Sequence, residues 1–379
     1  MDLQELRQEI DRTDDEIIRL VTQRMDISHK IAEYKKENGM AVFHAGRERE
    51  KLADVAAKSR EDVREYMQVL YNLIFELSRS HQNRILRPSN DVAEEVRLAM
   101  ENTPKLFPQN ASVVCQGVEG AYSTIAAERL FRNPNIMYVN SFEGAFSAIE
   151  SGLCQYGILP IENSTAGSVN QVYDLMISRN FHIVRSVRIK VDHNLLAKPG
   201  VELSQVKEIF SHEQAIRQCE GFLKKMGVKV TACANTAMAA KMVAESDRTD
   251  VAALSSRRCA ELYGLVALQK DVQDNNNNHT RFICISKKME IYPGADKTSL
   301  MLITANRPGA LYKVLAKFYA LGISLSKLES RPLPDRDFEF MFYFDLETSI
   351  YSDAFLRVIC ELGDACEEFK YLGSYSEIV

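Results

Sequence analysis

The sequence predicts a multidomain protein: an all-α three-helix dimeric domain, a two-lobed α/β domain, and a ferredoxin-like α+β domain. Three observations predict this order. Residues 1–87 contain no proline and repeat their apolar residues at helical spacing. From Ser112, apolar strand segments alternate with helical ones. From residue 296 the predicted elements follow the order βαββαβ, which is typical of a ferredoxin-like unit.

The first stretch is predicted to hold three helices. Its apolar residues recur at Leu3, Leu6, Ile10, Ile17, Leu20, Val21, Ile27 and Ile31. A break falls at Asn38-Gly39, a second helix starts near Arg47, and a third runs from about Ser59 to Arg87. The first helix would be about 50 Å long, which is more than a small domain can cover. We therefore expect two copies to pair as an intertwined helical dimer.

The remaining boundaries follow changes in composition. We place the helical domain at 1–88, a linker at 89–110 with a short helix around 91–101, the α/β domain at 111–288 and the ferredoxin-like domain at 297–379. The predicted strands lie at 112–117, 136–139, 156–161, 182–191, 207–211, 228–233, 250–254, 281–286, 298–304, 323–330, 338–346 and 367–374. The α/β domain should form two lobes with a cleft, similar to periplasmic-binding proteins. The run Asn275 to Asn278 is expected to be an exposed loop.

Composition excludes several classes of function. A net charge of -5 and a pI near 5.9 argue against a nucleic-acid partner. The absence of a basic tract and of a long apolar run argues against a membrane partner. The charged opening MDLQELRQEID does not resemble a secretory signal. The eight cysteines form no Cys-x-x-Cys pair, so we expect reduced thiols, no metal and a cytoplasmic protein.

Two polar pairs share the inner faces of the predicted helices. Arg24 and Lys35 lie eleven residues apart, which is three turns, and Ser78 and Gln82 lie one turn apart. Inward cations require an anion to offset their desolvation, although charged residues on helices more often face solvent. This arrangement resembles the all-helical chorismate mutases. The resemblance implies a chorismate site in which Arg7 crosses from the partner subunit. The other implied site residues are Arg24, Lys35, His44, Arg47, Glu48, Ser78 and Gln82.

The mutase reaction is a unimolecular rearrangement, so it requires fixed cations that fold the dicarboxylate and stabilise charge on the ether oxygen, and no general base. One departure concerns residue 44. The family usually carries an Asp where this chain has His44. A neutral imidazole can still form the hydrogen bond, or His44 is simply a surface residue and the mutase is weakened.

The α/β stretch places polar residues where strands lead into helices, which is where such folds bind ligands. The first segment runs from Gly117 to Tyr122 and Ser123, and the second from Glu162 through Asn163, Ser164 and Thr165 to Ser168. The others are Ser211-His212 and His279-Thr280-Arg281-Phe282. Turn chemistry or helix capping would explain several of these residues without a ligand.

Together these segments resemble the prephenate dehydratases. The resemblance implies that Thr280 is catalytic and donates a hydrogen bond to the leaving hydroxyl. Arg281 would hold a substrate carboxylate, or would serve as a structural ion pair. Phe282 would form a wall of the site. Polar contacts to prephenate would come from Tyr122, Ser123, Asn163, Ser164, Thr165, Ser211 and His212. Nothing in this chemistry requires a metal or an organic cofactor.

Two segments of the last domain resemble the ACT regulatory domain. They are Arg307-Pro308-Gly309-Ala310-Leu311, at a strand-to-helix turn, and Glu329-Ser330-Arg331-Pro332. The resemblance implies an L-phenylalanine effector bound by Gly309, Ala310, Leu311, Glu329, Ser330 and Arg331 where two copies pair. Gly309 could equally be a turn residue.

The domain order resembles that of the bifunctional chorismate mutase–prephenate dehydratases. This resemblance implies chorismate and prephenate as substrates, inhibition by phenylalanine, and a homodimer or homotetramer. Three alternatives remain: arogenate as the preferred substrate, an impaired mutase, or a non-catalytic regulator that senses an amino acid.

Overall fold

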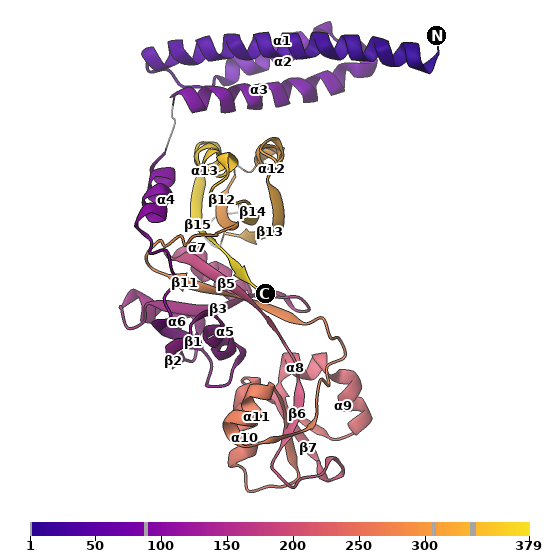
Figure 1. The fold of residues 1–379 in the computed structure, drawn as a ribbon. Coiled ribbons are helices and arrows are strands. Elements are labelled where there is room, and N and C mark those ends of the chain that lie inside the picture. The colour runs from indigo at the N-terminus through magenta and orange to yellow at the C-terminus, as the bar shows by residue number, and fades with distance from the viewer. Residues whose placement is uncertain (1, 87–89, 305, 307, 334–338) are drawn as a thin grey trace.

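The computed structural model describes residues 2–86, 90–304, 306, 308–333 and 339–379. Figure 1 shows the helical region at one end of the molecule, followed by the ferredoxin-like unit and then two separate α/β parts. The helical region comprises α1 (Leu3–Glu37), α2 (Ala45–Lys58), a short 3-10 turn (Glu61–Val63) and α3 (Arg64–Leu86). The predicted stop at Pro88 lies outside the described residues.

Capping residues fix the ends of these helices. The Asp2 side chain accepts hydrogen bonds from the backbone N–H groups of Gln4 and Glu5, and the Glu5 side chain accepts one from the backbone N–H of Asp2. Together these bonds form a capping box. The prediction that the third helix begins near Ser59 was wrong. Ser59 ends α2, and its hydroxyl donates to the carbonyl of Val55. The chain therefore turns before α3 begins at Arg64.

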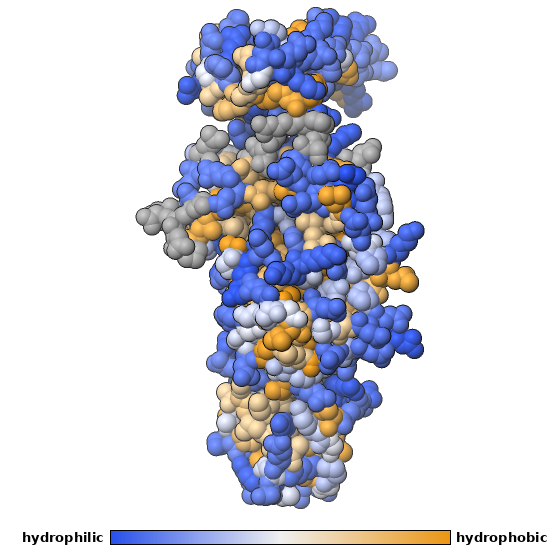
Figure 2. Space-filling view, turned by 90° about the vertical axis from the view of Figure 1, so that its left-hand side faces the viewer, coloured by the Kyte–Doolittle hydropathy of each residue, from blue (hydrophilic) through white to orange (hydrophobic). Residues whose placement is uncertain are grey.

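The α1 helix leaves much of its apolar surface uncovered. Ser28 and Ala32 are its buried residues, and both lie in its C-terminal half. Its exposed apolar residues include Leu3, Leu6, Ile10, Ile17, Ile18, Leu20, Val21, Ile27 and Ile31. Figure 2 shows orange apolar side chains among the blue ones on the helical region.

The first sheet has seven strands in the order β16-β5-β11-β3-β1-β2, with β4 beside β3. Its strands are β1 (Asn110–Gln116), β2 (Asn133–Val139), β3 (Tyr156–Asn163), β4 (Gly167–Ser168), β5 (His182–Lys190), β11 (His279–Ser286) and β16 (Glu377–Ile378). Its helices are α5 (Tyr122–Leu130), α6 (Phe142–Glu150) and α7 (Asn170–Ser178). The apolar strands are buried on both faces, as layered α/β folds require.

The second sheet has five strands in the order β10-β6-β9-β7-β8. Its strands are β6 (Asn194–Ala197), β7 (Glu208–His212), β8 (Lys229–Cys233), β9 (Val251–Ser255) and β10 (Val266–Gln269). A 3-10 turn (Leu203–Gln205) precedes β7, and the helices are α8 (Glu213–Gln218), α9 (Glu220–Met226), α10 (Thr236–Glu245) and α11 (Arg257–Tyr263). The chain crosses between the two sheets at residues 191–193 and 270–278. All eight predicted α/β strands are present, and the short strands β4, β6, β10 and β16 were not predicted.

The third sheet has four strands in the order β13-β14-β12-β15. Its elements are β12 (Lys297–Ile303), α12 (Ala310–Ala320), β13 (Ser324–Pro332), β14 (Phe340–Glu347), α13 (Asp353–Ala365) and β15 (Glu368–Tyr375). This is the predicted βαββαβ order. One face packs on α12 and α13, while Met301, Tyr343 and Leu372 of the other face share a core with α7 and the first sheet.

Two segments connect the third sheet more closely to its neighbours than expected. Helix α4 (Asp91–Asn102), predicted as part of a linker, buries Ala93, Val96 and Ala99 in the core beneath α13. The chain then leaves the third sheet, and β16 pairs in parallel with β5 of the first sheet. The ferredoxin-like unit is therefore packed against the α/β part on one face and joined to it at its exit strand.

Candidate functional site

The helical region brings together four of the residues predicted to bind chorismate. Arg24 of α1 donates to the hydroxyl of Ser78 on α3. Lys35 donates to Gln82 Oε1 at 3.2 Å and to the carbonyl of Val42 at 2.6 Å. Burial lowers the pKa of Arg24 and also that of Lys35, where Glu48 opposes the effect. Both cations are thus partly desolvated, and an anionic ligand bound there would raise their pKa values and stabilise their charged forms.

Ser28 and Arg79 belong to this cluster although the sequence pattern did not select them. Gln82 Nε2 donates to Ser28 Oγ at 3.1 Å. Arg79 forms ion pairs with Glu48 of α2 and Glu76 of α3. Its position directly after Ser78 could have drawn attention to it, but it lies off the predicted inner stripe. Glu48 is therefore held at the cluster by a cation from α3.

The other three predicted residues lie at the exposed edge of this region. Arg47 pairs with Glu50 at 2.7 Å, with both side chains about 70% exposed. His44 is the N-cap of α2, and its Nδ1 accepts from the backbone N–H of Arg47 at 3.1 Å. Arg7 is exposed and precedes Arg24 by seventeen residues of α1, or about 25 Å. Arg7 of this copy is thus too far away to complete the same cluster.

Asn163 organises the polar cluster at the end of β3 and the start of β11. Its Nδ2 donates to Thr280 Oγ1 at 2.9 Å, to Asn278 Oδ1 at 2.7 Å and to the carbonyl of His279 at 3.2 Å. Its Oδ1 accepts from the backbone N–H groups of Thr165 and Ala166. The pairing of Thr280 with Asn163 across β11 and β3 places these groups together. The amide consequently fixes the position of the Thr280 hydroxyl.

The same cluster extends toward the crossing between the two sheets. Ser164 Oγ donates to the carbonyl of Asn277 at 3.0 Å and accepts from His279 N–H at 2.9 Å. Asn278 donates to Gln218 of α8 at 3.0 Å, and Gln218 contacts His193 at 2.9 Å. The prediction of an exposed Asn loop was correct for residues 275–277 but wrong for Asn278, which is 2% exposed.

Four of the predicted prephenate residues use their polar atoms within the protein. Tyr122 donates to the carbonyl of Asp192, and Ser123 donates to the carbonyl of Gln116. The other two lie on the second sheet, where Ser211 donates to the carbonyl of Leu254 and His212 caps α8. The structure therefore does not bring Ser211 and His212 into the Asn163 cluster.

Arg281 and Phe282 occupy structural positions. Arg281 is 4% exposed, and its Nη2 donates to Asp345 of β14 at 2.6 Å. Its Nε lies 2.7 Å from Glu162, although this N–H does not point at the oxygen. Burial would lower the pKa of Arg281, but Asp345, Tyr375, Tyr343 and Glu162 raise it. The structural ion pair is thus the observed role of Arg281, and Phe282 packs in the core at 3% exposure.

The predicted effector residues divide between two places. Gly309 has φ +81° and precedes α12, so this turn requires a residue that tolerates the left-handed region. Glu329 accepts from Ser168 at 2.8 Å, and Arg331 pairs with Asp174 of α7 at 2.9 Å. Ser330, at the alternate position of β13, is exposed. Arg307 lies outside the described residues. The side chains of Glu329 and Arg331 are therefore contacts with the α/β part.

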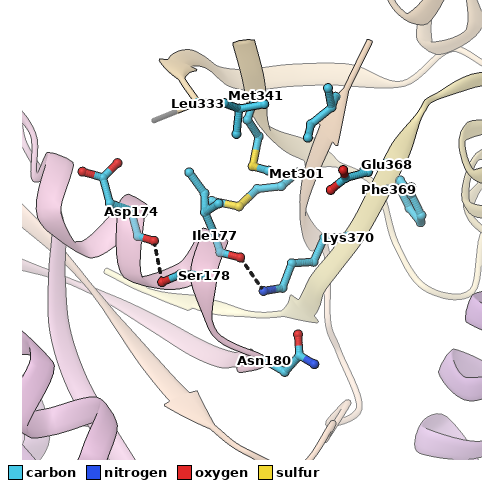
Figure 3. A pocket seen from close by; sticks show the side chains of 11 residues that line it. Asp174, Ile177, Ser178, Asn180, Met301, Leu333, Met341, Glu368, Phe369 and Lys370 are labelled. Atoms are coloured by element: carbon cyan, nitrogen blue, oxygen red, sulfur yellow. Dashed lines mark hydrogen bonds between the residues drawn. The ribbon is translucent and has the colours of Figure 1, made fainter. Parts of the chain in front are cut away.

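A cavity of about 650 Å³ lies between α7 and the third sheet (Figure 3). Met301, Met341 and Ile177 form its apolar wall. Lys370 caps α7 by donating to the carbonyls of Met176 at 2.7 Å and Ile177 at 3.3 Å, and burial lowers its pKa to about 8. Its ammonium is therefore used to hold α7.

Within the described parts of the chain, no cluster of three or more His, Cys, Asp or Glu side chains has metal-binding geometry. Of the described helices, none combines the length and apolar character needed to cross a bilayer.

Comparison with known families gives two matches in chain order. The family model for chorismate mutase type II matches residues 6–83, and that for prephenate dehydratase matches residues 113–290. A bifunctional chorismate mutase/prephenate dehydratase of Buchnera aphidicola is 30% identical over 97% of this chain and 95% of its own length. The chloroplastic arogenate dehydratase/prephenate dehydratase 2 of Arabidopsis thaliana is 38% identical over 69% of this chain and 72% of its own.

Two solved structures resemble about 70% of the chain. A prephenate dehydratase from Arthrobacter aurescens in complex with L-Phe is 27% identical, with a TM-score of 0.64, covering 70% of this chain and 89% of that one. A protein described as a novel type of quorum quenching acylase is 31% identical, with a TM-score of 0.64, covering 69% of this chain and 97% of that one.

Proposed function

Since this chain belongs to the bifunctional chorismate mutase/prephenate dehydratase family, we propose that it rearranges chorismate to prephenate and then decarboxylates and dehydrates prephenate to phenylpyruvate. One observation carries this proposal. The bifunctional relative aligns over 97% of the chain, and the matches to the two enzyme families follow each other in the same order.

For the first reaction, the paired cations Arg24 and Lys35 would hold the dicarboxylate in its folded shape. Ser78 and Gln82 orient those cations by direct hydrogen bonds, so little reorganisation is needed when charge develops on the ether oxygen. Glu48 would bind the substrate hydroxyl. Arg47 and His44 would approach from the start of α2, and Arg7 would come from the partner subunit.

For the second reaction, the hydrogen-bond direction at Thr280 supports its proposed catalytic role. Its Oγ1 accepts from Asn163, so its own proton is free to point outward. The hydroxyl can then donate to the leaving group of prephenate while aromatisation drives loss of carbon dioxide. Ser164 and Thr165 would supply further polar contacts. Tyr122 and Ser123 would shape the site from the first sheet, and Ser211 and His212 would contribute to it only from the second sheet.

Arogenate is a second candidate substrate for the same site. The Arabidopsis relative, at 38% identity, carries both arogenate and prephenate dehydratase in its name. Arogenate differs from prephenate in carrying an amino group where prephenate has a keto group. Parallel assays with the two substrates at equal concentration separate these possibilities.

We further propose that the third sheet with α12 and α13 is an ACT domain that binds L-phenylalanine. The Arthrobacter structure, which contains L-Phe, supports this ligand. The turn Gly309–Leu311 would bind the ligand's polar groups, with Ser330 from the exposed face of β13. In this arrangement Glu329 and Arg331 would transmit the effect through Ser168 and Asp174. Phenylalanine would favour a less active arrangement of the subunits.

A second copy of the chain is the proposed partner, in a homodimer or homotetramer. The α3 helix has 23 residues and α1 has 35, so α3 cannot cover α1 along its whole length. The uncovered N-terminal stripe, including Leu6, Ile10 and Ile17, is apolar. A second α1 packed there would bury these residues and bring Arg7 to the partner's site.

The test is a coupled assay of the purified protein that follows chorismate consumption and phenylpyruvate formation, with and without L-phenylalanine. Both reactions should proceed, and phenylalanine should lower the rate of phenylpyruvate formation. Failure to consume chorismate, with prephenate still dehydrated, would refute the mutase assignment alone.

A further inference from the structure

Arg79 links three segments around the proposed chorismate site. Its side chain is 16% exposed and forms ion pairs with Glu48 of α2 and Glu76 of α3. Its guanidinium also lies over the ring of Phe43, 5.4 Å from the centroid. Because Glu48 is a proposed substrate contact, the cation that fixes its position influences the site directly.

The contacts continue from Glu76 into the ferredoxin-like unit. Lys313 of α12 lies 3.0 Å from Glu76 Oε1, the same oxygen that faces Arg79. Burial raises the pKa of Glu76, but Arg79, Lys313 and Lys317 together hold it below its ordinary value. Glu76 is therefore an anion that two cations from different domains share.

Two neighbouring contacts hold the same surfaces together. Ser80 Oγ donates to Glu361 Oε1 at 2.6 Å, and Lys317 donates to the other oxygen of Glu361 at 3.4 Å. A cavity of about 560 Å³ lies beside them, with Phe43, Arg79 and Lys313 in its wall. The proposed mutase site is thus linked to α12 by consecutive ion pairs that run from Glu48 through Arg79 and Glu76 to Lys313.

We infer that Arg79 is a positioning residue of the mutase reaction and that Lys313 controls it through Glu76. This inference rests on the proposed mutase function. Glu48 and Glu76 bind different nitrogens of one guanidinium, and Lys313 neutralises part of the charge of Glu76. Loss of Lys313 strengthens the attraction of Glu76 for Arg79 and draws the guanidinium away from Glu48. Lys313 also lies one turn after Gly309–Ala310, so movement of the proposed effector turn would reach Arg79 by the same contacts.

The test uses the full chain with Arg79→Lys and Lys313→Gln. Arg79→Lys keeps the charge but removes the fork that holds two carboxylates, so the mutase kcat should fall about tenfold or more. Lys313→Gln should lower it by about two- to fivefold, since the lysine is part of a half-exposed pair. The kcat for prephenate dehydration and the thermal unfolding midpoint should stay unchanged in both variants.

Two matched controls separate positioning from loss of charge. Arg97→Lys alters an arginine that also holds two glutamates, Glu94 and Glu101, and Lys224→Gln removes a lysine paired with Glu220. Neither should change the mutase kcat. An unchanged mutase kcat in Lys313→Gln overturns the inference, and so does an equal fall of both activities. A wild-type protein that does not consume chorismate would refute the proposed mutase function itself, and this role with it.

Discussion

Asn163 is the residue on which the geometry of the proposed dehydratase site depends. Both polar atoms of its amide are engaged, and it is 8% exposed. Its Nδ2 orients Thr280 while its Oδ1 fixes the turn at Thr165. A change of one atom in this amide therefore changes the direction in which the threonine hydroxyl points.

Asn163→Asp tests this role with almost no change in side-chain volume. A carboxylate cannot donate to Thr280 Oγ1, so the hydroxyl would turn its proton toward residue 163. We expect kcat for prephenate dehydration to fall about 100-fold. The matched control is Asn133→Asp, which alters an exposed amide paired with Asn110. An unchanged rate in Asn163→Asp would contradict the proposed orientation of Thr280.

Asn163 and Thr280 could be singled out from the sequence, whereas the residues that they contact could not. Each of these two residues lies within a recognisable segment. Asn278 belongs to an asparagine run whose composition indicates a loop, and only the register of β11 on β3 brings it inside. Arg281 pairs with Asp345, which lies 64 residues away in another sheet, so no local pattern could identify that partner.

Helix α1 carries many large apolar side chains that are exposed and not buried. At 100° per residue, Leu6, Ile10 and Ile17 fall on one side of the helix, and Ile18 falls well away from that side. The periodicity predicted the helix, since spacing within one element is local information. The sequence could not show how much of the stripe α3 would cover.

Substitutions on α1 test the proposed pairing of two copies. The double variant Ile10→Lys/Ile17→Lys places charges on the uncovered stripe, so the protein should dissociate toward monomer and lose mutase activity, because Arg7 no longer reaches its partner. Sedimentation velocity measures the association. Ile18→Lys, an exposed residue off the stripe, is the control and should remain associated. An assembly of unchanged size in the double variant would exclude this face as the interface.

The second sheet offers a pH test at β7. Glu208 is held by Lys229 at 2.8 Å, Arg248 at 2.6 Å and Thr231 at 2.8 Å, and these contacts lower its pKa to about 2. As pH falls below about 4.5, the unfolded chain binds the proton first, so the folded state loses this contribution between about pH 4.5 and 2.

The unfolding midpoint of the Glu208→Gln variant should therefore depend less on pH across that range. Near neutral pH the variant should be less stable than the wild type. Thermal unfolding followed by circular dichroism measures both effects. Glu213→Gln removes an exposed carboxylate paired with Arg217 and serves as the comparison. If the unfolding midpoint of Glu208→Gln varied with pH as that of the wild type does, the stabilising role of this carboxylate would be contradicted.

In the whole molecule, ion pairs join the third sheet to the α/β part, and two of them differ in burial. Arg281–Asp345 joins β11 to β14 with side chains 5% and 1% exposed, while Arg331–Asp174 joins β13 to α7 with side chains 20% and 50% exposed. The first link is buried and the second is in contact with solvent. Their contributions to stability should therefore differ in size.

Asp345→Asn leaves Arg281 without its buried partner and should lower the free energy of unfolding by about 3–5 kcal/mol. Asp174→Asn should lower it by less than about 1 kcal/mol, because solvent screens the exposed pair. Urea unfolding of the two variants measures the difference. Equal effects would mean that Asp345 is not the principal counter-ion of Arg281.

The order of the longer helices and strands was predictable, but the packing of these elements between domains was not. Each strand or helix depends on neighbours in sequence, whereas the packing of α4 beneath α13 depends on residues more than 250 positions apart, as the contacts of Asn90 with Ile359 and Cys360 show. The predicted linker consequently proved to be part of a core.

The parallel pairing of β16 with β5 has a consequence for exchanging parts between relatives. The ferredoxin-like unit shares segments with the rest of the chain: α4, which precedes the α/β part, packs in its core, and Glu377–Ile378, which follow it, pair with the first sheet. Glu377 pairs with Arg188 on β5 at 2.7 Å, and Gly373 passes so close to Ile183 that a side chain would collide with its carbonyl. A chimera that grafts a foreign unit onto residue 288 would lose the edge strand of the first sheet. A successful chimera would have to retain this chain's α4, its glycine at the crossing and its exit strand.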